Sequence, residues 1–186
     1  MNNIEQFEWS DALFLPEDET WDLVTNHQDS GNKKREDIGG DNMGIKGWSF
    51  SEELHDETII TVVENNFGIK FPDDYKRCVK LNNGGYPEPN CFNMVDGEQG
   101  VFNNLLSFTN KNLNIMMFYD FAEESSIEGL VPIARDPFGN LLCFDYRSSN
   151  LSPEIIFYDH EETGDEAIIP VCRTFTELLD GLYSTE

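Results

Sequence analysis

The chain has 186 residues, enough for one domain or one domain with an extension, and its 36 Asp and Glu against 12 Lys and Arg give a formal net charge of -24. Because 39% of the residues are hydrophobic and 12% aromatic, the composition excludes a disordered acidic tail and indicates a globular fold. The charge argues against nucleic acid or anionic membranes as partners and favours basic proteins, although acidity can equally serve solubility alone.

Neither an export signal nor a membrane span is predicted. Residues 1–6 lack the basic start and apolar stretch of a signal peptide, and no apolar run approaches the ~20 residues that cross a bilayer. The four cysteines are far apart among apolar residues, so we expect reduced core thiols in a cytoplasmic protein. They are Cys78, Cys91, Cys143 and Cys172.

Residues 1–47 are predicted to form an N-terminal extension. Short apolar groups, the last at 21–24, suit strands or anchoring segments. The five glycines from Gly31 to Gly47, with the charged run 33–37, predict a long loop. We therefore expect the main domain to occupy residues 48–186.

A first helix is expected near the start of this domain. Ser49 and Glu52 have the spacing of a capping box, and apolar residues from Ile59 to Phe67 follow at roughly helical spacing. Their β-branched members also suit a strand, so both alternatives stay open. Gly68 is expected to end the segment.

A second helix is predicted from Pro72, which suits the first helical position, with Asp73 and Asp74 in its first turn. Residues 82–85, Asn-Asn-Gly-Gly, are expected to end it, because Asn and Gly tolerate the left-handed conformation of a helix C-cap. Such a turn also lets backbone approach a partner closely, which is the functional alternative.

The second half of the chain alternates short apolar runs with turn residues. Residues 91–95 and 102–108 are candidate strands, and 114–122 suits either a strand or a helix. Residues 130–134 and 141–146 are predicted to form a hairpin, followed by strands at 155–158 and 168–171.

A final helix closes the predicted domain. Thr174 and Glu177 form a second possible capping box, and Phe175, Leu178, Leu179 and Leu182 share one helical face. Helices at both ends with hairpin-like strands between them predict an α+β fold with a largely antiparallel β-sheet flanked by helices.

Three stretches, taken in order, resemble the SUKH superfamily of bacterial immunity proteins and fungal cell-wall assembly regulators. The first comprises Glu64, 67–69, 71–76 and 83–85, the second 131–145, and the third 155–161 with Thr174 and Phe175. Phe71 departs from the usual Leu, and the N-terminal extension has no counterpart. The motif residues with an expected structural role are Phe71, Pro72, Tyr75, Asn83, Gly84, Gly85, Gly139 and Asn140.

The resemblance implies an α+β fold and a protein-binding role. Bacterial members of the superfamily typically neutralise a toxin encoded by a neighbouring gene, often a nuclease. We therefore expect an immunity protein that binds a cognate toxin, a basic nuclease-type domain, and occludes its active site. The alternative is a regulatory or scaffold adaptor that binds the cell's own proteins, as in the fungal branch.

The sequence offers little support for an enzyme. None of the three histidines pairs with a second His or Cys at metal-ligand spacing, and no nucleophile elbow, P-loop or dinucleotide motif is present. Residues 159–166 begin like a calcium loop, but Pro170 stands where a bidentate Glu is needed. We expect no catalytic residue, no metal site and no cofactor.

Two acidic stretches are the candidates to meet a basic partner, although each of their residues also suits a solvated loop. They comprise Asp120, Glu123, Glu124 and Glu128 in the first stretch, and Asp159, Glu161, Glu162, Asp165 and Glu166 in the second.

Overall fold

The computed structural model describes residues 44–111, 113–124 and 128–185, without the side chains of Phe121, Glu123 and Glu124. The apolar groups and the long loop predicted within residues 1–43 lie outside the described residues. Residues 44–46 belong to the folded body: the Gly44 amide donates to the Leu182 carbonyl at 2.8 Å, and the Ile45 amide to that of Leu179 at 3.1 Å. The domain boundary at residue 48 stays a prediction.

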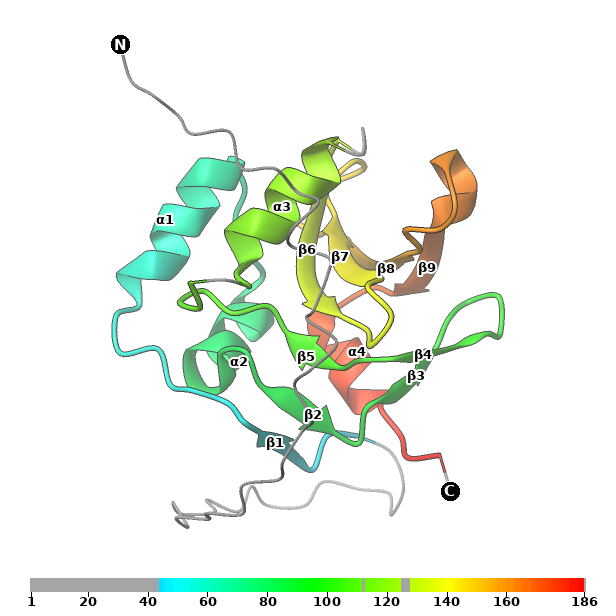
Figure 1. Cartoon of the computed structure of the whole chain (residues 1–186), viewed down its shortest axis with the longest axis horizontal. Helices are drawn as coiled ribbons and strands as arrows, with labels where there is room; N and C mark the ends of the chain where they lie inside the picture. Colours follow the sequence, from blue (N-terminus) through cyan, green and yellow to red (C-terminus); the bar gives the residue numbers. More distant parts are fainter. Residues whose placement is uncertain (1–43, 112, 125–127, 186) are drawn as a thin grey trace, which may run out of the picture. The chain divides into compact units, whose positions relative to one another are not determined.

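The described chain is built from short strands and short helices (Figure 1). The helices are α1 (Thr58–Phe67), α2 (Asp73–Asn82), α3 (Ile115–Glu124) and α4 (Phe175–Asp180), with the 3₁₀ turn η2 (Gly164–Ala167). The strands are β1 (Gly47–Ser49), β2 (Tyr86–Glu88), β3 (Cys91–Asn93), β4 (Gln99–Val101), β5 (Asn104–Leu105), β6 (Leu130–Arg135), β7 (Leu141–Asp145), β8 (Glu154–Tyr158) and β9 (Ile168–Cys172).

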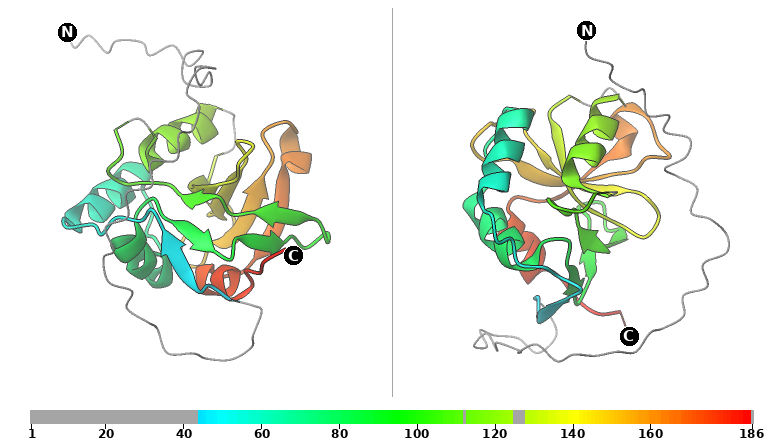
Figure 2. Two further views of the ribbon diagram at one scale, coloured as in Figure 1. Left: turned by 60° about the horizontal axis from the view of Figure 1, so that its bottom comes forward. Right: turned by 60° about the vertical axis from the view of Figure 1, so that its left-hand side comes forward.

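The main sheet has five antiparallel strands in the order β5-β6-β7-β8-β9, so each strand pairs with its neighbour in the chain. Two smaller antiparallel ladders join β1 with β2 and β3 with β4. The successive strands β2 and β3 run along one side of a long bent hairpin, and β4 and β5 along the other (Figure 2). The predicted α+β fold with a largely antiparallel sheet is confirmed.

An aromatic cluster joins the helices to the sheet. The Tyr75 ring from α2 lies 5.3 Å from Phe144 on β7 and 5.2 Å from Phe175 on α4, measured between ring centroids. Leu141 and Cys143 alternate with Phe144 along β7 and belong to a second buried cluster, so both faces of this strand are covered. The central strand of the sheet is therefore buried on both faces, and the loops at the strand ends are attached to this rigid core.

The predicted capping box at Ser49 and Glu52 is wrong, because Ser49 ends β1 and α1 begins only at Thr58. The Asp56 carboxylate instead accepts a hydrogen bond from the Thr58 amide at 2.9 Å. The predicted end at Gly68 is confirmed, and this residue has a left-handed φ of 68°. The β-branched residues of α1 are thus accommodated in a helix, where their apolar face packs into the core.

The start of α2 differs from the prediction by one residue, whereas its predicted end within residues 82–85 is confirmed. Pro72 is the N-cap and not the first helical residue. Asn83 is the C-cap with φ of -56°, and the left-handed residue is Gly84, with φ of 70°. Gly84 thus adopts the left-handed conformation that follows the helix, and the Asn83 side chain forms hydrogen bonds to a distant loop.

The remaining elements settle the open alternatives. Residues 115–122 lie in the helix α3 and Asn114 directly precedes it, while the candidate strand 102–108 contains only the short strand β5. The hairpin β6–β7 and the strands β8 and β9 are confirmed. The capping box of α4 is also confirmed at its Thr174 side: the Glu177 amide donates to Thr174 Oγ1 at 3.1 Å.

The four cysteines of the described part of the chain form no disulfide there; Cys91 and Cys143 are buried as expected, and Cys78 and Cys172 are partly exposed. Among the described helices, none is both long and apolar enough to cross a membrane.

Candidate protein-binding groove

Asn83 has an exposed fraction of only 2% and fastens the loop that follows β5. Its Oδ1 accepts from the Phe108 amide at 2.8 Å, and its Nδ2 donates to Thr109 Oγ1 at 2.8 Å and to Ser107 Oγ at 3.2 Å. Its backbone exchanges two hydrogen bonds with Glu52. One buried amide thus fixes two segments that are far apart in the sequence, which is why another side chain cannot replace it.

Gly85 provides the close packing next to this amide. A Cβ atom at this position would lie 2.8 Å from the Ser51 Cβ and 3.1 Å from the Trp48 ring. The Gly85 carbonyl also accepts from the Leu105 amide at 2.9 Å, which links β2 to the edge of the main sheet. The Gly-Gly pair therefore serves packing within this chain: Gly84 supplies the turn and Gly85 the space.

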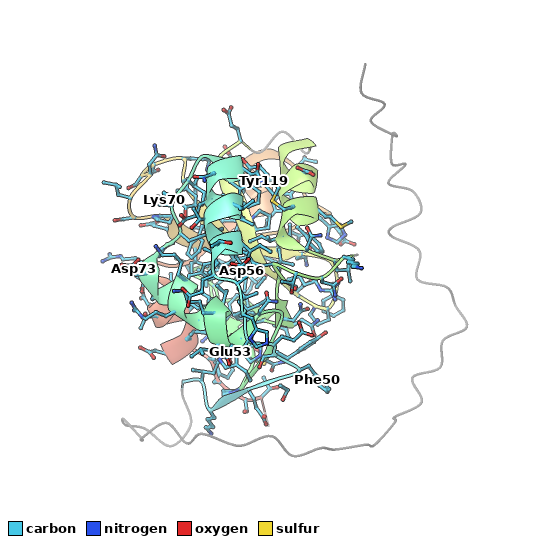
Figure 3. All side chains as sticks on the ribbon, turned by 90° about the vertical axis from the view of Figure 1, so that its left-hand side faces the viewer. Phe50, Glu53, Asp56, Lys70, Asp73 and Tyr119 are labelled. Carbon is cyan, nitrogen blue, oxygen red and sulfur yellow. The ribbon has the colours of Figure 1, made fainter. Side chains whose placement is uncertain are left out.

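Phe50 is unusual both in its exposure and in its backbone conformation. Its exposed fraction is 88%, and its φ of 53° places it in the left-handed region, where a side chain other than glycine is strained by about 1–2 kcal/mol. Its ring meets the Tyr86 ring edge-on with centroids 5.8 Å apart. Figure 3 shows Phe50 projecting from the end of β1, far from Lys70 and Tyr119 on the same face. A strained, exposed aromatic residue is a feature of binding surfaces.

Phe50 and Tyr86 border an open groove of about 490 Å³ whose floor is formed by Asn83 and Gly84. The groove is also lined by the loop between β5 and α3, including Lys111 and the half-exposed Leu113, and by Arg135 at the end of β6. Most of its lining is polar. The groove is open to solvent, so a protruding segment of another protein can enter it.

The charge of the groove lining differs in sign from that of the whole chain. Its lining carries two basic side chains, Lys111 and Arg135, and one acidic side chain, Glu52. Arg135 donates from Nε to Asn104 Oδ1 at 2.9 Å and forms no ion pair with any described residue. By contrast, four other basic side chains are neutralised in pairs: Lys70–Glu64, Lys76–Asp73, Lys80–Glu57 and Arg147–Asp145.

The acidic residues predicted to meet a partner lie elsewhere. Asp159, Glu161, Glu162, Asp165 and Glu166 occupy the connection from β8 to β9, including η2, and all but Asp159 are exposed. Asp120 on α3 and Glu128 before β6 are exposed too, whereas the side chains of Glu123 and Glu124 lie outside the description. None of the seven residues whose side chains are described lines the groove.

Arg147 lies near one residue of the second acidic stretch. Its side chain packs over Gly129. Its hydrogen bonds to Asp145 raise the pKa of Arg147, and the Asp165 carboxylate in the second stretch contributes to the same rise.

The predicted motif residues Gly139 and Asn140 stabilise the β6–β7 turn. The buried Asp136 accepts from the Asn140 amide and from Asn140 Nδ2, both at 2.8 Å, and Asn140 Oδ1 lies 2.7 Å from His160 Nδ1. This network holds the acidic connection after β8 against the hairpin. Within the described residues, no three His, Cys, Asp or Glu side chains are grouped as metal ligands.

The sequence analysis missed the groove because its walls come from separate elements. Phe50 lies in a loop between two Ser, with no periodicity that predicts exposure, and Lys111 and Arg135 are isolated charges. The available signal was the Asn83-Gly84-Gly85 motif, of which Asn83 and Gly84 line the groove.

A family model described as SMI1-KNR4 cell-wall (SUKH_6) matches residues 57–179, which is more than half of the chain. The match includes Asn83, Lys111 and Arg135 but not Phe50. Comparison with curated proteins and with solved structures gave no match.

Proposed function

We propose that this chain, which belongs to the SMI1-KNR4 family of the SUKH superfamily, is an immunity protein that binds a protein toxin and neutralises it. The observation that carries the proposal is the family match across α1 to α4, which contains the floor of the groove. Protein binding is the role that the superfamily implies, and the groove offers a surface for it. We assign binding and occlusion, not catalysis, as its mode of action.

The net charge of -24 supports a basic partner. A nuclease-type toxin grips phosphates with Lys and Arg, and an acidic surface competes for the same cleft. Complementary fields raise association rates to on the order of 10⁸ M⁻¹s⁻¹ at low salt. We propose that the exposed connection after β8, with Glu161, Glu162 and Glu166, contributes to this attraction in the cytoplasm.

A second candidate is a regulatory or scaffold adaptor that binds the cell's own proteins. The observation that favours it is the description of the matched model, which refers to the cell wall. An adaptor needs no toxin, so the genomic neighbourhood and a rescue experiment separate the two functions.

Rescue by co-expression tests the proposal. The toxin-like domain encoded beside this gene is expressed alone and then with the full chain, and growth and copurification are followed. We expect growth arrest without the chain, and growth with a stable complex in its presence. Arrest in both cultures, with no complex, would reject the immunity function and favour the adaptor.

A further inference from the structure

Lys111 and Arg135 are exposed to a groove in which little neutralises them. Neither forms an ion pair with a described residue, although the chain as a whole carries three times as many acidic as basic side chains. Lys46, Arg77 and Arg173 share this property, but they do not line the groove. The pair Lys111 and Arg135 is thus a local cationic site on an acidic protein.

Arg135 is held in place for recognition. Its Nε is fixed by Asn104 Oδ1 at 2.9 Å, and Asn104 itself is held by a hydrogen bond from its Nδ2 to the Leu105 carbonyl at 2.8 Å. A guanidinium fixed at Nε keeps its outer N–H groups for a carboxylate, which it binds in a planar, two-pronged geometry. Lys111 in the neighbouring loop adds a second positive charge.

Apolar surface lies in the same groove. The Phe50 ring is almost fully exposed next to Tyr86, and Leu113, which also lines the groove, has an exposed fraction of 43%. An apolar side chain placed against these residues removes area from water at roughly 25 cal/mol per Å². The lining of one groove therefore contains both cationic and apolar side chains that a bound peptide segment can contact.

We infer that the groove binds a short segment of the partner in which an Asp or Glu lies beside an aromatic or aliphatic residue. The carboxylate pairs with Arg135 and Lys111, and the apolar side chain packs against Phe50 and Tyr86. A phosphate-rich ligand is disfavoured, because the field of a chain with charge -24 repels a polyanion, whereas a basic partner with one local carboxylate is attracted as a whole.

The inference rests on the proposed function only in assigning the segment to the partner. Attraction of the partner and selection of the partner are then carried out by two different surfaces of the chain. The acidic connections attract basic proteins from a distance. Among these proteins, the groove selects those that place a carboxylate against Arg135 and Lys111.

A random-peptide library displayed on phage provides the test. The full chain is the target, and the library is first depleted on the double variant Phe50→Ser, Arg135→Gln. We expect enriched peptides to carry Asp or Glu within two residues of an aromatic or aliphatic residue. Enrichment of Lys- and Arg-rich peptides, or no enrichment, would overturn the inference.

Titration of an enriched peptide then identifies the contacts. Arg135→Gln is expected to raise the Kd about tenfold, as loss of one charge-assisted hydrogen bond does. The exposed Lys111→Gln is expected to raise it severalfold, and the control Arg173→Gln, outside the groove, less than twofold. Changing the peptide's acid to its amide should weaken binding less in the Arg135→Gln protein than in the natural chain, and should have no further effect in the double variant Lys111→Gln, Arg135→Gln. Equal Kd values for Arg135→Gln and Arg173→Gln would contradict the inference.

The outcome is distinguishable from failure of the proposed function. If the Arg135→Gln and Lys111→Gln proteins rescue growth as well as the natural chain does, the immunity function stands and the groove assignment fails. If even the natural chain gives no rescue, the immunity function fails, and the peptide titration still decides what the groove binds.

Discussion

Glu64 is the one charged residue of α1, and it is buried, with an exposed fraction of 5%. Its Oε1 accepts from the Phe71 amide at 3.0 Å, and its Oε2 pairs with Lys70 Nζ at 2.6 Å. A carboxylate at this depth is tolerated only because donors from the segment before α2 surround it. Glu64 thus fixes the turn that leads from α1 to α2.

We expect Glu64→Ala to lower the free energy of unfolding by about 2–4 kcal/mol, because the buried Phe71 amide loses its acceptor and the lysines lose their partner. Glu64→Gln keeps one acceptor and should lose less. The exposed pair Glu57–Lys80 is the matched control, and Glu57→Ala should change the value by less than about 1 kcal/mol. Urea unfolding measures all three, and equal losses for Glu64→Ala and Glu57→Ala would contradict this account.

Two tyrosines provide a second test at this scale. The Tyr75 hydroxyl is buried without a hydrogen-bond partner among the described residues, whereas the Tyr146 hydroxyl donates to the Lys70 carbonyl at 2.9 Å. We expect Tyr75→Phe to leave the free energy of unfolding unchanged or to raise it, and Tyr146→Phe to lower it by about 1 kcal/mol. Thermal unfolding compares the two, and a larger loss for Tyr75→Phe would show that its hydroxyl is satisfied.

Asn83 shows what residue-level sequence analysis leaves out. A motif of Asn before two Gly predicts a helix end on backbone grounds, and the helix does end there. The partners of the Asn83 side chain lie 24 to 26 residues away, in a loop whose position depends on the whole fold. No local pattern contains that information.

At the scale of elements, the junction of β1, β2 and β5 depends on the absence of a side chain at Gly85. We expect Gly85→Ala to destabilise the protein more than Gly84→Ala, because a Cβ at Gly85 meets Ser51 at 2.8 Å, whereas at Gly84 its nearest contact is 3.5 Å and only the left-handed φ is strained. The expected losses are about 2–3 kcal/mol and about 1 kcal/mol. Chemical unfolding gives the order, and the reverse order would contradict the assigned roles.

The end of the β6–β7 hairpin should carry a pH-dependent contribution. Partial burial favours a higher pKa for Asp145, but its hydrogen bonds and ion pair with Arg147 outweigh burial and lower the pKa. A lowered pKa in the folded state means that the stabilisation is present above the unfolded value, near 4, and is lost as pH falls through the folded value.

Arg147→Gln should therefore reduce the free energy of unfolding at pH 7 by at most about 1 kcal/mol, since the pair is partly exposed. The difference from the natural chain should be smaller near pH 2, because the ion pair is lost as the pH falls through the lowered folded pKa of Asp145. Urea unfolding at the two pH values checks this. A difference of the same size at pH 2 would assign the effect to packing of Arg147 over Gly129 and not to its charge.

Elements differ in how much of them the sequence predicts. The β6–β7 hairpin follows from two apolar runs around a Pro–Gly turn, and α4 from its cap and one apolar face, because these are local patterns. The start of α1 was mispredicted, since Ser49 and Glu52 match a capping box but pair with β2 and Asn83 instead. Tertiary pairing overrode a local signal.

For the whole molecule, composition predicts the acidic character, the order of the predicted helices and strands predicts the α+β class, and the ordered motifs predict the family. The groove could not be predicted, because Phe50, Asn83, Lys111 and Arg135 meet only when four separate segments are folded together. The charge of the chain and the charge of its groove are therefore independent features, and only the first is visible in the sequence.

Inhibition of the purified toxin domain tests the central claim most directly. The domain encoded beside this gene is assayed for its activity while the full chain is added at low and at moderate salt. The account predicts that one equivalent abolishes activity, that association slows at least about tenfold between roughly 0.05 and 0.3 M salt, and that Glu161→Lys with Glu162→Lys slows it further. Full activity in a tenfold excess of the chain at both salt concentrations would contradict it.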